Sequence, residues 1–140
     1  MHEELSKCPE DTERIGTQIA GKLRKGDIVG FTGGLGAGKT FIIQSICKAL
    51  GINEVVTSPT FALVHEYKGS KKIAHFDCYR LRTPQDAELL GLYEYFDSQF
   101  ICLIEWADKI KSILPDTFVD ISLARIPGKP QWRTVSINGL

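Results

Sequence analysis

Residues 33–40 constrain the fold of this chain more than any other stretch, because they match the pattern G-x-x-x-x-G-K-T. Glycines allow the backbone to wrap with its N–H groups pointing inward, which forms a concave site for an anion. Lys39 supplies a mobile positive charge for bound phosphates, and the Thr40 hydroxyl is suited to Mg²⁺. The pattern predicts a phosphate-binding loop with nucleotide contacts from Gly33, Gly34, Leu35, Gly36, Ala37, Gly38, Lys39, Thr40 and Phe41.

The segments on either side of this loop have the composition that it requires. Residues 28–32 form a short apolar run suited to a buried parallel strand. Residues 41–50 have apolar side chains at helical spacing, and Gly51 follows as a C-terminal stop. The positive end of that helix would face the phosphates. The alternative is a glycine-rich turn that matches by chance, and the flanks favour phosphate binding.

Strand and helix signals alternate along the rest of the chain. They predict helices at residues 9–25, 83–91, 92–96 and 107–114, and further strands at residues 61–67, 73–77, 100–104, 118–123 and 132–137. This order predicts an α/β fold, a three-layer sandwich of the P-loop NTPase type. A hairpin turn and two consecutive terminal strands predict a mixed sheet with a parallel centre and antiparallel edges. We expect residues 1–140 to form one domain.

Charge and hydropathy exclude several classes of protein. Seventeen basic residues balance seventeen acidic ones, so a role with RNA would need a local patch or a partner. No apolar run approaches the roughly 20 residues of a membrane span, and residues 1–5 are too polar for a signal peptide. The four cysteines are widely spaced without a C-x-x-C pair, which argues against zinc and for reduced thiols. We expect a cytoplasmic protein without membrane contact.

A phosphate-binding loop needs a second strand that ends in an acid near Thr40, to place a metal ion or the attacking water. Two candidates exist. Glu105 follows a strongly apolar run, and Asp77 follows a weaker one that His75 interrupts. We favour Glu105 for the Mg²⁺ shell or for orienting water, and Asp77 as a second acid in that shell. A solvated carboxylate at a strand end is the alternative for both.

Two further polar residues are candidates for contact with bound phosphate. Thr60, in the segment Ser-Pro-Thr at residues 58–60, suits a mobile element that senses the γ-phosphate, with a tight turn as the alternative. Arg80 suits the stabilisation of transferred charge or the binding of an anionic partner, with a surface ion pair as the alternative.

Histidine and tryptophan side chains need separate consideration. His65 and His75 lie in predicted strands and are interpreted as core or edge residues. Trp106 directly follows Glu105 and is expected to pack near the site. Trp132 is a candidate for stacking on adenine, although an aromatic residue in a strand is more often part of the core.

Four motifs occur in an order and spacing that resemble a known family. They are residues 33–40, S-P-T-F at 58–61, H-F-D-C-Y-R-L at 75–81 and L-I-E-W at 103–106. Together they are similar to the bacterial TsaE (YjeE) family over nearly the whole chain. The four motifs in combination are far more specific than the phosphate-binding loop alone.

The resemblance implies a small P-loop ATPase required for threonylcarbamoyladenosine formation at tRNA position 37. It implies TsaB and TsaD as protein partners, contact with tRNA only indirectly through that complex, and ATP and Mg²⁺ as cofactors. ATP hydrolysis would reset the complex between turnovers. Since no internal arginine finger stands out in the sequence, we expect hydrolysis to be slow alone and faster with the partners.

The resemblance also implies roles for individual residues. Thr40 and Glu105 would be the magnesium ligands, and Lys39 would hold the phosphates. Asp77 and Trp106 would match residues that are important for activity, which makes Lys39, Asp77 and Glu105 the expected catalytic group.

By the same resemblance, an adenine pocket would lie between residues 8–12 and the C-terminal strand near Trp132 and Arg133. Two positions depart from the family pattern. Gly34 stands where the family commonly has Asp, and Phe41 where it commonly has Thr, so one hydroxyl contact to the nucleotide is lost.

Two other functions are compatible with a phosphate-binding loop. A small kinase acting on a metabolite usually has a lid with several arginines, and only Arg80 and Arg82 lie in the corresponding segment. A non-catalytic scaffold that binds nucleotide would not need Lys39, Thr40 and Glu105 together.

Overall fold

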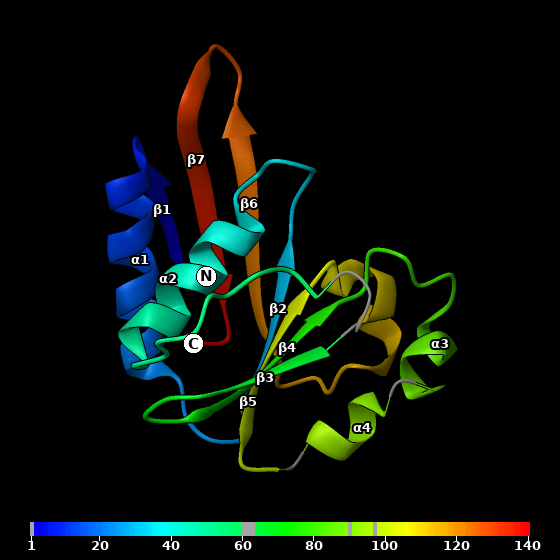
Figure 1. Ribbon diagram of the computed structural model, residues 1–140. Helices are drawn as coiled ribbons and strands as arrows, with labels where there is room; N and C mark the ends of the chain where they lie inside the picture. The colour runs from blue at the N-terminus through cyan, green and yellow to red at the C-terminus, as the bar shows by residue number, and fades with distance from the viewer. Residues whose placement is uncertain (1, 60–63, 90, 97) are drawn as a thin grey trace.

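A single sheet organises the molecule (Figure 1). The structure, a computed structural model, describes residues 2–59, 64–89, 91–96 and 98–140. The strands are β1 His2–Ser6, β2 Ile28–Thr32, β3 Val64–Lys68, β4 Lys72–Asp77, β5 Phe100–Glu105, β6 Val119–Ile126 and β7 Lys129–Asn138. The helices are α1 Pro9–Lys22, α2 Lys39–Ala49, α3 Pro84–Leu89, α4 Leu92–Tyr95 and the 3₁₀ helix η1 Ala107–Ile113.

The order of strands across the sheet is β1-β7-β6-β2-β5-β4-β3. The four central strands β6, β2, β5 and β4 pair in parallel. β7 and β1 on one side and β3 on the other join by antiparallel pairing. The prediction of a mixed sheet with a parallel centre and antiparallel edges is therefore confirmed.

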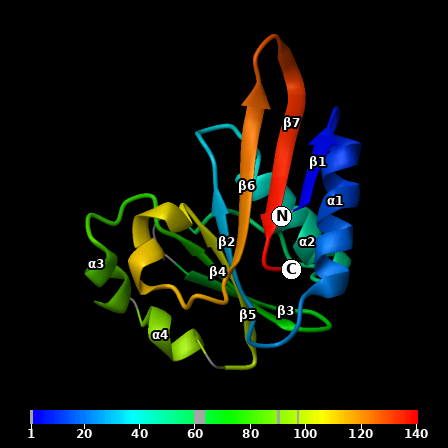
Figure 2. The same cartoon turned by 180° about the vertical axis from the view of Figure 1, so that it is seen from behind.

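Helices cover both faces of the sheet, and two apolar layers lie between helices and sheet (Figure 2). Val29, Ile73 and Leu103 pack on the face covered by α1 and α2, whereas Ala74 and Ile104 pack on the opposite face with α3, α4 and η1. This alternation follows from the two-residue repeat of a strand, and burial on both faces explains why β2 and β5 are apolar up to their last residues, Thr32 and Glu105. The predicted three-layer sandwich is confirmed.

Several boundaries differ from the sequence-based expectations. β1 was not expected, because it has no apolar alternation; its backbone pairs with β7 along the edge of the sheet. α1 ends at Lys22 instead of reaching Gly26, because Leu23 adopts an extended conformation and is buried in the core. The helix predicted at residues 107–114 is the 3₁₀ helix η1, Ala107–Ile113. β6 and β7 are longer than predicted.

The described residues include no helix that is long and apolar enough to cross a membrane. The cysteines are free thiols, and Cys47, Cys78 and Cys102 are buried. Burial raises the pKa of each of these three thiols to about 12, so they are protonated at neutral pH and pack as small apolar side chains.

Candidate functional site

The phosphate-binding loop lies at the carboxyl end of β2 and leads directly into α2. Its glycines are required by both conformation and space. Gly38, at the N-cap of α2, has φ 104°, which favours glycine. At Gly33 a Cβ atom would lie 2.5 Å from the backbone oxygen of Leu123, too close for any other residue. The loop is therefore pressed against β6 at its start.

Lys39 is held inside the loop that contains it. Its Nζ donates hydrogen bonds to the backbone oxygens of Gly33 at 2.6 Å and Gly34 at 2.9 Å, and lies 3.9 Å from the centre of the Trp106 ring. Burial lowers the pKa of the ammonium below its ordinary value, although nearby carboxylates, chiefly Glu105, oppose the shift. An incoming phosphate would replace the two carbonyl partners with a full negative charge.

Glu105 ends β5 and is almost fully buried, with 2% exposure. One carboxylate oxygen accepts a hydrogen bond from the Thr40 hydroxyl at 2.8 Å, and the other lies 2.7 Å from Nε2 of His75. Burial alone would raise the pKa of Glu105, but the hydrogen bonds and positive charge of its neighbours, led by His75, hold it below the ordinary value. The group is thus an ionised carboxylate in a fixed orientation.

His75 is the residue whose role the sequence interpretation missed. It is fully buried, as a core residue should be, yet its ring is bonded to the candidate metal ligand. Among the described residues, no group pairs with its Nδ1 atom. The strand repeat places His75 and Asp77 on one face of β4, but only the pairing of β4 with β5, which aligns Asp77 with Glu105, shows that this face meets Glu105.

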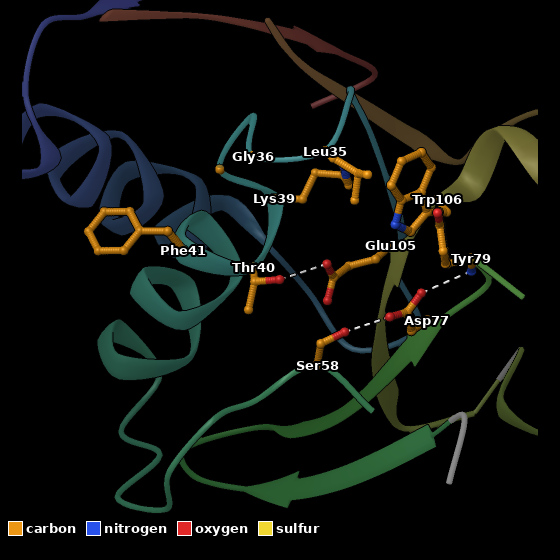
Figure 3. A pocket seen from close by; sticks show the side chains of 11 residues that line it. Leu35, Gly36, Lys39, Thr40, Phe41, Ser58, Asp77, Tyr79, Glu105 and Trp106 are labelled. Carbon is orange, nitrogen blue, oxygen red and sulfur yellow. Dashed lines mark hydrogen bonds between the residues drawn. The ribbon is translucent and has the colours of Figure 1, made fainter. Parts of the chain in front are cut away.

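Asp77 ends β4 beside Glu105, and both of its oxygens are engaged. The Ser58 hydroxyl donates to one oxygen at 2.5 Å, and the backbone N–H of Tyr79 donates to the other at 2.9 Å. We refer to Thr40, Ser58, His75, Asp77 and Glu105 as the acidic cluster. Three elements (α2, β4 and β5) and a loop, far apart in sequence, meet in it, and Figure 3 shows most of its side chains converging beside Lys39.

Trp106 follows Glu105 in a left-handed conformation with φ 57°. It is the one non-glycine residue with a positive φ in the described part of the chain, a conformation that costs about 1–3 kcal/mol and that clusters at functional sites. Its ring contacts Tyr79, with centroids 4.8 Å apart, and covers Lys39. The expected packing position near the site is therefore where the structure places it.

A cavity of about 370 Å³ opens between the loop and the acidic cluster (Figure 3). Its lining consists of Leu35, Gly36, Gly38, Lys39, Thr40, Phe41, Ser58, Asp77, Tyr79, Glu105 and Trp106. No group of three or more His, Cys, Asp or Glu side chains in the described residues could hold a metal. Mg²⁺ commonly binds through one or two carboxylates together with substrate phosphates, and the hydroxyl and carboxylate oxygens of Thr40 and Glu105 fit that pattern.

A second cavity of about 230 Å³ lies on the other side of the loop. Its lining consists of Pro9, Thr12, Ala37, Gly38, Phe41, Pro130, Gln131 and Arg133. Trp132 is not among these residues, although its chain neighbours Gln131 and Arg133 are. The ammonium groups of Lys7 and Lys129 lie 5.0 Å and 4.8 Å from the centre of its indole ring instead.

Two other candidate residues, Thr60 and Arg80, are not placed at either cavity by the structure. Thr60 is outside the described residues, as is the start of the predicted strand at 61–63. Arg80 is exposed and does not line either cavity. Conversely, Arg125 on β6 contacts the backbone of the phosphate-binding loop, and the sequence contained no signal for this contact because the two are far apart in the chain.

Comparison with known proteins agrees with this geometry. The family model described as "Threonylcarbamoyl adenosine biosynthesis protein TsaE" matches residues 6–132. The chain is similar to proteins named "tRNA threonylcarbamoyladenosine biosynthesis protein TsaE". The one from Treponema pallidum is 39% identical, over 85% of this chain and 88% of its own length. The one from Bacillus subtilis is 40% identical, over 84% of this chain and 73% of its own length.

Among solved structures, the crystal structure of Bacillus subtilis YdiB is similar, with a TM-score of 0.83 and 32% sequence identity. The match covers 97% of this chain and 83% of that one. The phosphate-binding loop, the acid at the end of β5 and these matches lead to the same assignment: the chain belongs to the TsaE family.

Proposed function

We propose that this protein is a Mg²⁺-dependent ATPase that acts in the threonylcarbamoyladenosine modification of tRNA. One observation carries the proposal. Thr40 of the phosphate-binding loop donates a hydrogen bond to the buried Glu105 carboxylate at 2.8 Å, beside Lys39 and at the wall of a cavity. These are the parts that a P-loop NTPase uses to hold phosphate and metal. The names of the relatives support the pathway.

In this proposal the residues of the larger cavity have separate roles in phosphate binding, metal binding and orientation of water. The loop N–H groups and Lys39 bind the β- and γ-phosphates. Thr40 and Glu105 would hold Mg²⁺, which supplies neutralisation of the charge that develops on the phosphates. Asp77, kept in place by Ser58 and Tyr79, lies one strand away and is suited to orient the attacking water. The smaller cavity, bounded by α1 and β7, would receive the adenine base.

The absence of an arginine from the described lining of the larger cavity supports activation of ATP hydrolysis by a partner protein. Of the described residues, no arginine lines the larger cavity, whereas an arginine finger contributes about 10³ to 10⁵ in rate. We therefore expect slow hydrolysis by the protein alone and faster hydrolysis with TsaB and TsaD, in the cytoplasm. As the family resemblance implies, contact with tRNA would be indirect, through that complex, and a chain with no net positive charge is compatible with this.

The test is phosphate release from MgATP, by the protein alone and with purified TsaB and TsaD, for the wild type and for Glu105→Gln. Glu94→Gln is the matched control, since Glu94 is exposed on α4 in the opposite layer. We expect stimulation by the partners that Glu105→Gln loses and Glu94→Gln retains. Absence of stimulation would remove the partner-activated role, and an unaffected Glu105→Gln would remove Glu105 from the chemistry.

A further inference from the structure

Two arginines of the β6–β7 hairpin contact the phosphate-binding loop from outside. Arg125 donates from Nε to the backbone oxygen of Gly36 at 3.2 Å. Arg133 donates from Nη2 to the same oxygen and from Nε to the backbone oxygen of Ala37, both at 3.2 Å. Figures 1 and 2 show this hairpin extending beyond the rest of the sheet beside the loop that joins β2 to α2.

The backbone at this contact favours glycine, because Gly36 has φ 73°. The Arg125 guanidinium lies where a Cβ atom of Gly36 would be, so the two groups are in close contact. Arg133 is further anchored, because its Nη1 donates to the backbone oxygens of Pro130 at 2.8 Å and Trp132 at 2.9 Å. The guanidinium of Arg133 is thus fixed by its own strand and directed at the loop.

The charges of the two arginines are not compensated by acids. Arg125 and Arg133 are direct register partners across the β6–β7 ladder, and like charges in that arrangement are destabilising. Neither forms an ion pair with a carboxylate of the described residues. Both arginines donate to the backbone oxygen of Gly36, on the outer side of the loop. The inner side of the same loop would bind anions. A bound anion would reduce the repulsion between the two arginines.

We infer that Arg125 and Arg133 are positioning residues for nucleotide binding, acting through the outer carbonyls of the phosphate-binding loop. This inference rests on the proposed function. Hydrogen bonds in series polarise one another, so donation to the Gly36 and Ala37 carbonyls makes the N–H groups of the same peptide units stronger donors. The two charges also add to the positive potential at the loop. Neither residue lines the larger cavity, which separates this role from that of an arginine finger. Arg133 also lines the smaller cavity, so Arg125, which lines neither cavity, is the residue that isolates the effect through the loop carbonyls.

The experiment measures two quantities, MgATP affinity by titration calorimetry and unfolding temperature without nucleotide. Arg125→Gln removes one charge and the Nε donor from an exposed side chain. Arg125→Lys keeps the charge, and Arg133→Gln removes the second member of the pair. Arg24→Gln is the control, because Arg24 is exposed before β2, at the opposite end of the sheet from the loop.

We expect Arg125→Gln to weaken MgATP binding roughly tenfold, because the loop N–H groups become weaker donors and one positive charge near the phosphates is lost. Its unfolding temperature without nucleotide should be unchanged or higher, since repulsion with Arg133 is relieved. Arg125→Lys should fall between the wild type and Arg125→Gln, Arg133→Gln should also weaken binding, and Arg24→Gln should bind as the wild type does.

A purely structural role would lower affinity and unliganded stability together, and that result would overturn the inference. Equal MgATP affinity in Arg125→Gln and the wild type would overturn it as well, while leaving the proposed function in place. A wild-type protein that binds no MgATP would overturn the proposed function and this inference at once.

Discussion

The two sides of the phosphate-binding loop are built in opposite ways. On the inner side His75 and the two carboxylates of the acidic cluster are buried, and the carboxylates are held by short hydrogen bonds, such as 2.7 Å between His75 and Glu105. On the outer side Arg125 is exposed and its contact with Gly36 is longer, at 3.2 Å. The buried side has the rigid geometry that a metal and a reacting water require. The exposed side contributes charge, which needs less exact placement.

The largest effect should come from Lys39→Ala, which removes the cation between the two sides. A charge pair at about 4 Å contributes about 4 kcal/mol at an effective dielectric constant of 20, so we expect MgATP affinity to fall at least about a hundredfold. Without nucleotide, stability should change little, because the loss of the hydrogen bonds to Gly33 and Gly34 is offset by no longer burying an ammonium that forms no ion pair with the described residues. Calorimetry and thermal unfolding measure the two effects, with the exposed Lys25→Ala as control.

His75→Leu tests whether hydrolysis depends on the orientation of the Glu105 carboxylate on the inner side of the loop. Loss of the donor leaves a buried carboxylate with one unpaired oxygen, at a cost of about 1–3 kcal/mol in the free energy of unfolding. We also expect hydrolysis to fall about tenfold, in the range for loss of an outer partner of a metal ligand. His75→Gln offers an amide donor to Glu105 and should recover part of the rate.

The neighbouring histidine provides the control for that measurement. His65 pairs with the Tyr67 hydroxyl at 3.1 Å and does not line the larger cavity. His65→Leu should leave the rate of hydrolysis unchanged. If it lowers the rate as much as His75→Leu does, the loss belongs to the sheet and not to the orientation of Glu105.

Phe41→Thr differs from the preceding variants, because it adds a contact with the nucleotide instead of removing one. Phe41 is 38% exposed at the start of α2 and lines both cavities. A threonine hydroxyl there would add one hydrogen bond to bound phosphate, about 0.5–1.5 kcal/mol, which corresponds to a roughly two- to tenfold gain in MgATP affinity. Phe41→Val introduces a side chain with the shape of threonine but without its hydroxyl. It therefore separates the effect of the hydrogen bond from the effect of losing the ring. An equal gain in both variants would assign the effect to space alone.

The smallest effect is the pH dependence that Glu105 contributes. Its pKa in the folded protein is below the ordinary value of 4.5, so its charge stabilises the fold above the unfolded pKa. That contribution is lost as the pH falls through the lower pKa of the folded state. Between about pH 5 and pH 3, the unfolding free energy of the wild type should therefore decrease more than that of Glu105→Gln. Parallel curves for the two proteins would contradict the stated shift.

Local pattern was sufficient for much of this molecule. The loop at residues 33–40 and the apolar strands before it and before Glu105 could be placed from the sequence, because glycine conformation and strand burial act on neighbouring residues. The same signals predicted the parallel centre of the sheet and an acid at the end of each of two strands. β1 could not be predicted in this way, since an edge strand of polar residues is stabilised by backbone pairing with β7.

Only the tertiary structure decided which distant side chains share a site. His75 meets Glu105 because β4 and β5 pair in a register that aligns Asp77 with Glu105. Arg125 and Arg133 reach Gly36 because the β6–β7 hairpin extends past the end of β2. Trp132, one residue away from Arg133, does not line the smaller cavity. Strand register and hairpin length are set by packing over the whole sheet, so a short motif does not contain them.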